Sequence, residues 1–249
     1  MKTPFILLPL AALALSACGY SVFDAAEDIQ GDDNGLSGGK AITSQAVTTA
    51  SFSKVNTVGP DNVVFVTGDT FSIKAEGDAA TMKKLRYSVK DGVIIIGRSK
   101  GSWLSSDGDG VTVTITAPTL TEAALAGSGN FTADKMTGDE LNLAIAGSGD
   151  ASVAAVTGKK LESKIAGSGN VVLSGKVDEA DFAVLGSGSI DAQKLTATDA
   201  DISIAGSGDA SLNATGKVDA KVAGSGSITV AGGAKCESKS MGSGSINCS

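Results

Sequence analysis

Apolar and polar residues alternate on both sides of a tripeptide, Gly-Ser-Gly, that recurs through the second half of the chain. The seven copies begin at Gly127, Gly147, Gly167, Gly186, Gly206, Gly224 and Gly242. The steps between successive copies are 20, 20, 19, 20, 18 and 18 residues. A repeat of this length is typical of a chain that winds into coils and stacks each coil on the one before.

The residues two and four places before each copy, and two and four places after it, are mostly apolar. Around the second copy they are Leu143 and Ile145 on one side and Ala151 and Val153 on the other. Alternation with a period of two indicates a strand with one buried face. Each repeat is therefore predicted to be a strand, a Gly-Ser-Gly corner and a second strand, with both strands facing a shared interior. Glycine suits the corner because it accepts a positive φ and lets coils approach closely.

The pattern predicts an all-β fold, a right-handed parallel β-helix with coils of about 18–20 residues. Parallel strands lie about 4.8 Å apart, so seven coils would extend roughly 30 Å. A stack of two-stranded hairpins in an antiparallel sheet also accounts for the alternation. A flexible linker is the alternative interpretation of Gly-Ser-Gly itself, but a linker has no reason to keep an apolar period beside every copy.

The stretch before the first copy also contains strand patterns, although they are less regular. Strands are expected over 62–67, 70–75, 93–96 and 111–115. One short helix is expected within 80–89, because Met82, Leu85 and Val89 have helical spacing. Residues 45–249 are accordingly expected to form a single β-helical domain, of which 121–249 carry the Gly-Ser-Gly repeats.

The first 17 residues have the pattern of a secretory signal peptide. Lys2 precedes an apolar run over 5–15, which is too short to span a bilayer comfortably. The sequence Leu15-Ser16-Ala17-Cys18 resembles the bacterial lipoprotein box. That resemblance implies that Cys18 becomes the mature N-terminus and carries a lipid, so the membrane is an expected partner through this anchor. Gly19 after the cysteine is similar to outer-membrane lipoproteins, which predicts a lipid-anchored location in the cell envelope, at the outer membrane.

Residues 18–44 are predicted to be the lipid anchor followed by a flexible acidic tether. Between Gly19 and Gly39 there is no Lys or Arg, and the charged residues are Asp24, Glu27, Asp28, Asp32 and Asp33. The whole chain has a formal net charge of −7. This acidic balance argues against a nucleic-acid partner and against a basic site for lipid head groups.

Four segments occur in an order that resembles one bacterial family. They are 51–55 (SFSKV), 89–95 (VKDGVII), 111–118 (VTVTITAP) and 125–129 (LAGSG). Together they are similar to the family called "putative auto-transporter adhesin, head GIN domain", over roughly residues 45–249. The resemblance implies an exported, often lipid-anchored protein with a β-helical fold. It supplies no catalytic residues.

The two C-terminal cysteines occupy inward positions of the final coil. Cys236 lies six residues before Gly242, and Cys248 lies four residues after Gly244. Both thiols therefore point into the coil from opposite sides of its corner. In an oxidising compartment we predict a disulfide between them. The alternative is a pair of buried free thiols.

The chain contains no histidine, which excludes Ser-His-Asp and Cys-His catalytic arrangements and the usual zinc and iron sites. The Gly-Ser-Gly copies also lack the Lys-Ser/Thr ending of a phosphate-binding loop. Aromatic residues make up only 4% of the chain, which is few for a carbohydrate-binding groove. The sequence therefore predicts no enzyme activity, no cofactor and no metal site.

Two rows of polar residues are expected to face outward. The acidic row stands five places before each corner and comprises Glu122, Asn142, Glu162, Asp181, Asp201, Asp219 and Glu237. We interpret it as a solvated face partly neutralised by Lys164, Lys221 and Lys239; cation binding, or polysaccharide binding or cleavage, are the alternatives. The post-corner row comprises Asn130, Asp150, Asn170, Ser189, Asp209, Ser227 and Ser245, and is expected to make local hydrogen bonds within each turn.

The sequence as a whole predicts a lipid-anchored β-helical protein of the cell envelope with a structural, adhesive or interaction role. Its expected partner, besides the membrane, is an envelope polysaccharide or another protein. Two alternatives stay open: a polysaccharide-binding or polysaccharide-cleaving β-helix that uses the acidic row, and a scaffold stabilised by divalent cations.

Overall fold

The structure is a computed structural model, and it describes residues 36, 38–99 and 110–249. The predicted signal peptide, Cys18 and the tether up to residue 35 lie outside the described residues. The strands are β1 (Lys40–Ala41), β2 (Val47–Thr48), β3 (Lys54–Gly59), β4 (Asn62–Thr67), β5 (Ser72–Glu76), β6 (Leu85–Lys90), β7 (Val93–Arg98), β8 (Thr112–Ala117), β9 (Glu122–Gly127), β10 (Phe131–Ala133), β11 (Met136–Gly147), β12 (Ala151–Gly167), β13 (Asn170–Gly186), β14 (Ser189–Ala197), β15 (Asp199–Gly206), β16 (Asp209–Ala214), β17 (Lys217–Gly224), β18 (Ser227–Ala231), β19 (Lys235–Gly242) and β20 (Ser245–Cys248). One short helix, α2 (Ala79–Met82), is found among the described residues.

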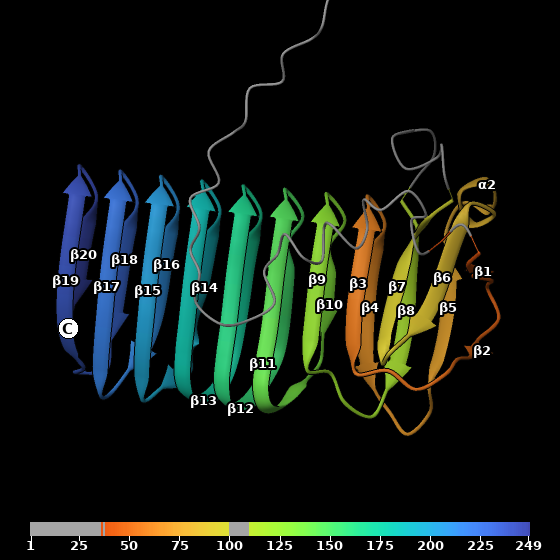
Figure 1. The fold of residues 1–249 in the computed structure, drawn as a ribbon, viewed down its shortest axis with the longest axis horizontal. Coiled ribbons are helices and arrows are strands. Elements are labelled where there is room, and N and C mark those ends of the chain that lie inside the picture. The colour runs from red at the N-terminus through yellow and green to blue at the C-terminus, as the bar shows by residue number, and fades with distance from the viewer. Residues whose placement is uncertain (1–35, 37, 100–109) are drawn as a thin grey trace, which may run out of the picture.

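The strands on either side of the corners pair in parallel with the equivalent strands one coil away. β11 pairs with both β9 and β12, which places Gly147 between Gly127 and Gly167. The same register continues coil by coil to Gly242. The corners therefore lie directly above one another, and the predicted all-β, parallel β-helical fold is confirmed. Figure 1 shows the coils side by side along the long axis, from β3 to β19.

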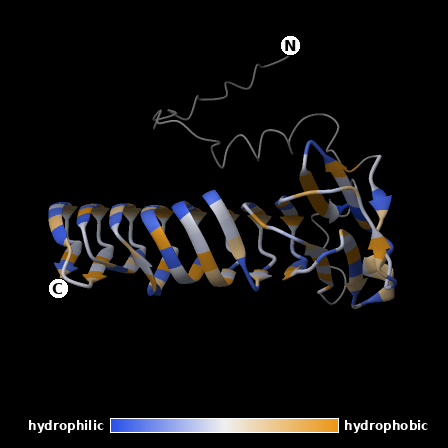
Figure 2. Cartoon of the chain, turned by 90° about the horizontal axis from the view of Figure 1, so that it is seen from below, coloured by the Kyte–Doolittle hydropathy of each residue, from blue (hydrophilic) through white to orange (hydrophobic). Residues whose placement is uncertain are grey.

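Two layers of strands enclose the interior. The layer that leads into the corners, the pre-corner layer, contains β3, β7, β9, β11, β15, β17 and β19, together with the second halves of β12 and β13. The layer that follows the corners, the post-corner layer, contains β4, β8, β10, β14, β16, β18 and β20, together with the first parts of β12 and β13. The two layers are seen in Figure 2. Phe65, Phe131 and Phe182 are fully buried between them.

Differences in coil length are absorbed away from the corners. The step from 20 to 19 residues appears as a register shift between Val153 and Val156, where β12 meets β13. Two further shifts lie between Val172 and Ser174, where β13 meets β14, and between Ala192 and Thr196, where β14 meets β16. All three lie within strands that follow a corner, past the glycines, so the corners themselves keep their alignment.

The first corner of the body is not a Gly-Ser-Gly. β3 and β4 form a coil whose corner is Gly59-Pro60-Asp61, and Gly59 pairs with Gly127 of the next corner. This coil lies inside the stack, because β7 pairs with the other side of β3 and β8 with the other side of β4. Beyond them, β5 and β6 pair in antiparallel fashion with β8 and β7, and β2 and β1 complete the edge.

The N-terminal part of the body differs from two expectations. The helix expected within 80–89 covers only Ala79–Met82, where the Asp78 carboxylate accepts a hydrogen bond from the Thr81 backbone N–H as an N-cap. Residues 85–90 form β6 instead, because Leu85 and Tyr87 alternate inward and pair with β7. The folded body also begins earlier than residue 45: β1 pairs with β6, and Ile42 is buried in the core.

Candidate functional site

The corners form a column that is held together by backbone contacts. Gly147 has a φ of +136°, and a Cβ at this position would overlap the carbonyl oxygen of Gly127. The Ser148 N–H donates to that same carbonyl oxygen at 2.9 Å. The serine side chains of the corners are exposed; they belong to Ser128, Ser148, Ser168, Ser187, Ser207, Ser225 and Ser243. The glycines of this column thus serve stacking, and only the serine hydroxyls are presented to solvent.

The post-corner row links neighbouring coils. Asn130 Oδ1 accepts a hydrogen bond from the Asp150 N–H at 3.0 Å, and Asp150 Oδ1 accepts one from the Asn170 N–H at 2.8 Å. Asp209 likewise accepts from the N–H and the hydroxyl of Ser227. The expectation that these side chains bond within their own turn is wrong for these residues, because each accepts from the coil that follows. Asn62, which precedes the repeats, makes the same bond to Asn130.

The acidic row is aligned by the parallel register, which places Glu162, Asp181 and Asp201 next to one another on three successive coils. Burial raises the pKa of Asp181, and the neighbouring charges of Glu162 and Asp201 raise it further. Lys160 opposes this effect by its charge. The row is therefore a place where like charges are held close together on a sheet.

Lysine side chains neutralise much of this row. Lys54 lies 3.0 Å from Glu122, Lys221 lies 3.4 Å from Asp201, and Lys164 pairs with Glu162. Two residues before the row, Lys160 pairs with Glu179 at 2.8 Å, and this hydrogen bond raises the pKa of Lys160. Within 38–99 and 110–249, no group of three or more His, Cys, Asp or Glu side chains is arranged to hold a metal ion.

Sequence reasoning missed a buried ion pair near the first corner. Arg98 Nε lies 2.7 Å from Asp61 Oδ2, and Arg98 Nη2 lies 2.7 Å from Asp61 Oδ1, with both side chains almost fully buried. The hydrogen bond to Asp61 raises the pKa of Arg98. The available signal was the position of Asp61, which takes the place of the last glycine in a Gly-Ser-Gly corner.

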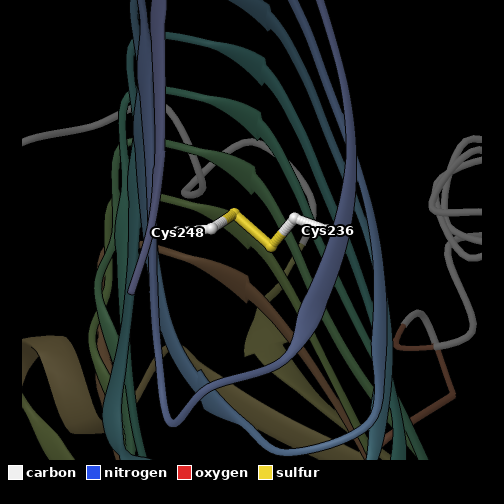
Figure 3. The surroundings of a disulfide bond; sticks show 2 residues. All are labelled: Cys236 and Cys248. Carbon is white, nitrogen blue, oxygen red and sulfur yellow. A yellow bond between two sulfur atoms is a disulfide. The ribbon is translucent and has the colours of Figure 1, made fainter.

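The two C-terminal cysteines are joined by a disulfide, with their Cα atoms 6.5 Å apart. Cys236 lies on β19 and Cys248 on β20, so the bond connects the two layers across the last coil (Figure 3). The inward positions Ser238 and Ser240 of this coil are exposed, whereas the equivalent positions of the earlier Gly-Ser-Gly coils are buried. The disulfide therefore fastens the end of the stack where the apolar core stops.

A small-molecule site is not evident in the part of the chain that the structure describes. A hollow of about 190 Å³ at the N-terminal end is lined by residues including Lys40, Tyr87 and Val89. This volume is below the range of about 300–1,000 Å³ that is usual for ligand pockets. The described residues also include no helix of the length and apolarity that crossing a bilayer requires.

These features define a class: a β-helical protein that presents straight rows of side chains on an elongated body. The sequence matches the family described as "putative auto-transporter adhesin, head GIN domain" over residues 51–234. The chain belongs to this family. The match ends just before β19, so the disulfide-linked last coil lies beyond the matched residues. No curated protein matches the sequence.

Solved structures support the same fold. A putative adhesin from Bacteroides fragilis is 25% identical, with a TM-score of 0.74, and the alignment covers 82% of this chain and 95% of that one. A putative lipid binding protein from Parabacteroides distasonis is 27% identical, with a TM-score of 0.66 and the same coverage. A putative adhesin from Parabacteroides merdae is 23% identical, with a TM-score of 0.65 and again the same coverage.

Proposed function

We propose that this protein is a lipid-anchored adhesive or structural element of the cell envelope, and that it works by presenting its side-chain rows rather than by catalysis. The observation that carries the proposal is the register of the coils. From Gly127 to Gly242 the first glycine of each corner and the five residues before it stand directly beside their equivalents in the next coil. A rigid body that offers the same chemistry at every step suits multivalent contact with an extended partner.

The attachment part of the proposal depends on Cys18. The sequence Leu15-Ser16-Ala17-Cys18 resembles a lipoprotein box, and the acidic stretch that follows would keep the body away from an anionic membrane surface. Lipid chains on one residue hold a soluble domain at a bilayer, since each buried methylene contributes about 0.8 kcal/mol. Gly19 favours the outer membrane as the destination, and membership in an adhesin family favours an envelope location.

Metabolic labelling with an alkyne analogue of palmitate tests the anchor. The wild-type chain should incorporate the label and fractionate with membranes, and Cys18→Ala should do neither. The matched control is the double variant Cys236→Ser/Cys248→Ser, which loses two cysteines but keeps Cys18 and should label normally. Labelling that persists in Cys18→Ala contradicts the anchor. Membrane binding without labelling would instead indicate noncovalent lipid binding, as the name of the Parabacteroides distasonis relative suggests for that protein.

Binding of intact cells tests the adhesive role. Beads coated with the full chain carrying Cys18→Ala are expected to retain cells or isolated envelope material, and beads coated with the heat-unfolded chain are not. The acidic row is tested separately with Asp201→Asn/Asp219→Asn, against the control Asp139→Asn/Asp178→Asn, which removes the same charge from exposed positions outside the row. Selective loss in the first variant favours a polysaccharide-binding function of the row. Release of unsaturated sugars would contradict a non-catalytic role.

A further inference from the structure

The two ends of the β-helix are finished differently. At the N-terminal end, the antiparallel strands β5 and β6 cover the parallel coils, and β1 and β2 pair with them in turn. At the C-terminal end, β19 pairs with β17 and β20 pairs with β18, and no other described strand pairs with either of them. Edge strands of this kind present unpaired N–H and C=O groups that are ready to pair with another chain.

In the last coil, the backbone N–H and C=O groups of every second residue face this open edge. Lys235 N–H donates to Gly216 O at 2.8 Å, and Ser245 N–H donates to Gly226 O at 3.1 Å. In a parallel ladder the residues that bond to one neighbour alternate with residues that face the other way. The odd-numbered residues of β19 and β20 thus bond into the stack. The even-numbered ones, among them Ser238 and Ile246, offer their N–H and C=O groups to the edge.

From this edge we infer that the protein forms a two-fold homodimer, in which β19 pairs antiparallel with β19 of a second copy and β20 pairs with β20. A two-fold axis perpendicular to both layers reverses the strand direction of the second copy and keeps each of its layers in the plane of the same layer of the first. The β19 edges and the β20 edges can therefore pair at the same time. The disulfide shows which residues of the two strands lie opposite one another. Cys236 and Cys248 face one another, and two residues closer to the corner on each strand are Ser238 and Ile246. An axis that passes through Ser238 on β19 therefore also passes through Ile246 on β20.

The charges of β19 select this register. Lys235, Glu237 and Lys239 are exposed on the outward side, and none of them forms an ion pair with another described residue of the chain. Pairing about Ser238 places Glu237 of each copy opposite Lys239 of the other, so two pairs of opposite charge form. Moving the centre by one residue in either direction would put Glu237 or Lys239 opposite itself.

The other edge strand agrees with the same axis. Pairing of β20 about Ile246 brings the two Ile246 side chains together, and each is only partly buried in the single chain. Shifting the centre two residues to Cys236 would leave only Lys235 of β19 on one side of the axis, and on β20 the axis would pass through Cys248, the last residue of that strand. The register about Ser238 and Ile246 is therefore the one that joins both strands over their length.

Sedimentation velocity on the full chain carrying Cys18→Ala tests the dimer without a contribution from acylation. We expect a monomer–dimer equilibrium at low salt. Glu237→Lys and Lys239→Glu should each raise the dimer Kd at least tenfold, because like charges then face one another. The swapped double variant, Glu237→Lys/Lys239→Glu, should restore the Kd to within about threefold of the original. Asp178→Lys is the control, since it makes the same reversal at an exposed position on β13, away from the edge strands.

Hydrogen exchange supplies an independent readout. The amides of Ser238, Ser240 and Ile246 should become more protected as the protein concentration rises, and amides of the interior coils should not change. A chain that stays monomeric up to about 100 μM, the weak end of specific association, would overturn the inference. A dimer that is indifferent to both charge reversals would overturn it as well.

Discussion

Arg98 at the end of β7 and Asp61 in the first corner form a bidentate ion pair inside the protein, with two nitrogen–oxygen distances of 2.7 Å. The pair ties the coil formed by β3 and β4 to the strand that lies beyond it. Glycine fills the equivalent position of the Gly-Ser-Gly corners, so this corner differs from the others in carrying a buried charge. The Asp61 carboxylate thus lies at the boundary between the repeated coils and the irregular N-terminal cap.

Arg98→Met should lower the free energy of unfolding by about 3–5 kcal/mol, because it leaves Asp61 charged and buried without this partner. The double variant Asp61→Asn/Arg98→Met should lose clearly less than the sum of the two single losses. Urea unfolding at pH 7 measures all three. Strictly additive losses would mean that the two side chains do not act as a pair.

Gly147→Ala should destabilise the body by about 3 kcal/mol or more, since the new Cβ overlaps the carbonyl oxygen of Gly127 and the positive φ is strained for alanine. Gly59→Ala is the matched control. Gly59 also has a positive φ, of +114°, but nothing lies within 4 Å of its Cβ position. This variant should show only the backbone strain, about 1 kcal/mol. Equal losses in thermal unfolding would mean that close approach of the corners is unimportant.

Reduction of the disulfide should loosen the last coil and leave the rest of the stack folded. The bond closes a loop with a sequence separation of 12, which corresponds to about 3 kcal/mol by the chain-entropy model. In a stacked fold each coil contacts only its neighbours, so the loss should stay local. Hydrogen exchange with and without reductant should show faster exchange across β19 and β20, while β15 stays unchanged. Two alkylated thiols in the unreduced protein would contradict the bond.

Asp181→Asn should stabilise the protein at pH 7 and have little effect near pH 3. The pKa of Asp181 is raised in the folded state by burial and by the charges of Glu162 and Asp201. The folded protein therefore binds this proton more tightly than the unfolded chain does. Stability declines as the pH rises from the unfolded pKa through the folded one, and the loss is complete above it. Asn carries no charge and avoids this loss.

Thermal unfolding of both proteins at the two pH values measures the effect. Asp139→Asn is the control, because Asp139 is exposed and pairs with Lys159 at 2.8 Å. Removing the charge of Asp139 should not raise the stability of the protein at pH 7. An Asp181→Asn variant that is less stable at pH 7 would show that the carboxylate makes a favourable contact there.

The repeated half of the fold could be predicted because one rule acts on every coil. The inward alternation about each corner, such as Leu143 and Ile145, fixed which face is buried, and the glycine spacing fixed the register. The repeat does not predict the corner at Gly59, because Pro60 and Asp61 replace Ser-Gly there. The helical prediction is wrong for β6, since Met82, Leu85 and Val89 fit a helical period as well as a partly buried strand.

The rows were harder to predict than the fold. Residues such as Asp150 have a known preference for turns, and that preference is local. The structure shows their partners 20 residues away, on the next coil. Such partners are visible only after the coils are aligned. The Asp61–Arg98 pair joins residues 37 positions apart through an irregular segment, for which no repeat supplies an alignment.

The register shifts near Val153 and Ala192 have a consequence for how such a chain can change over time. On the side of the corners, every coil keeps the same register with its neighbours. The part of the coil away from the corners accommodates differences in coil length. Insertions of a few residues in that part would project as loops without disturbing the column of corners. New recognition surfaces could therefore be added there, one coil at a time, on a frame that stays the same.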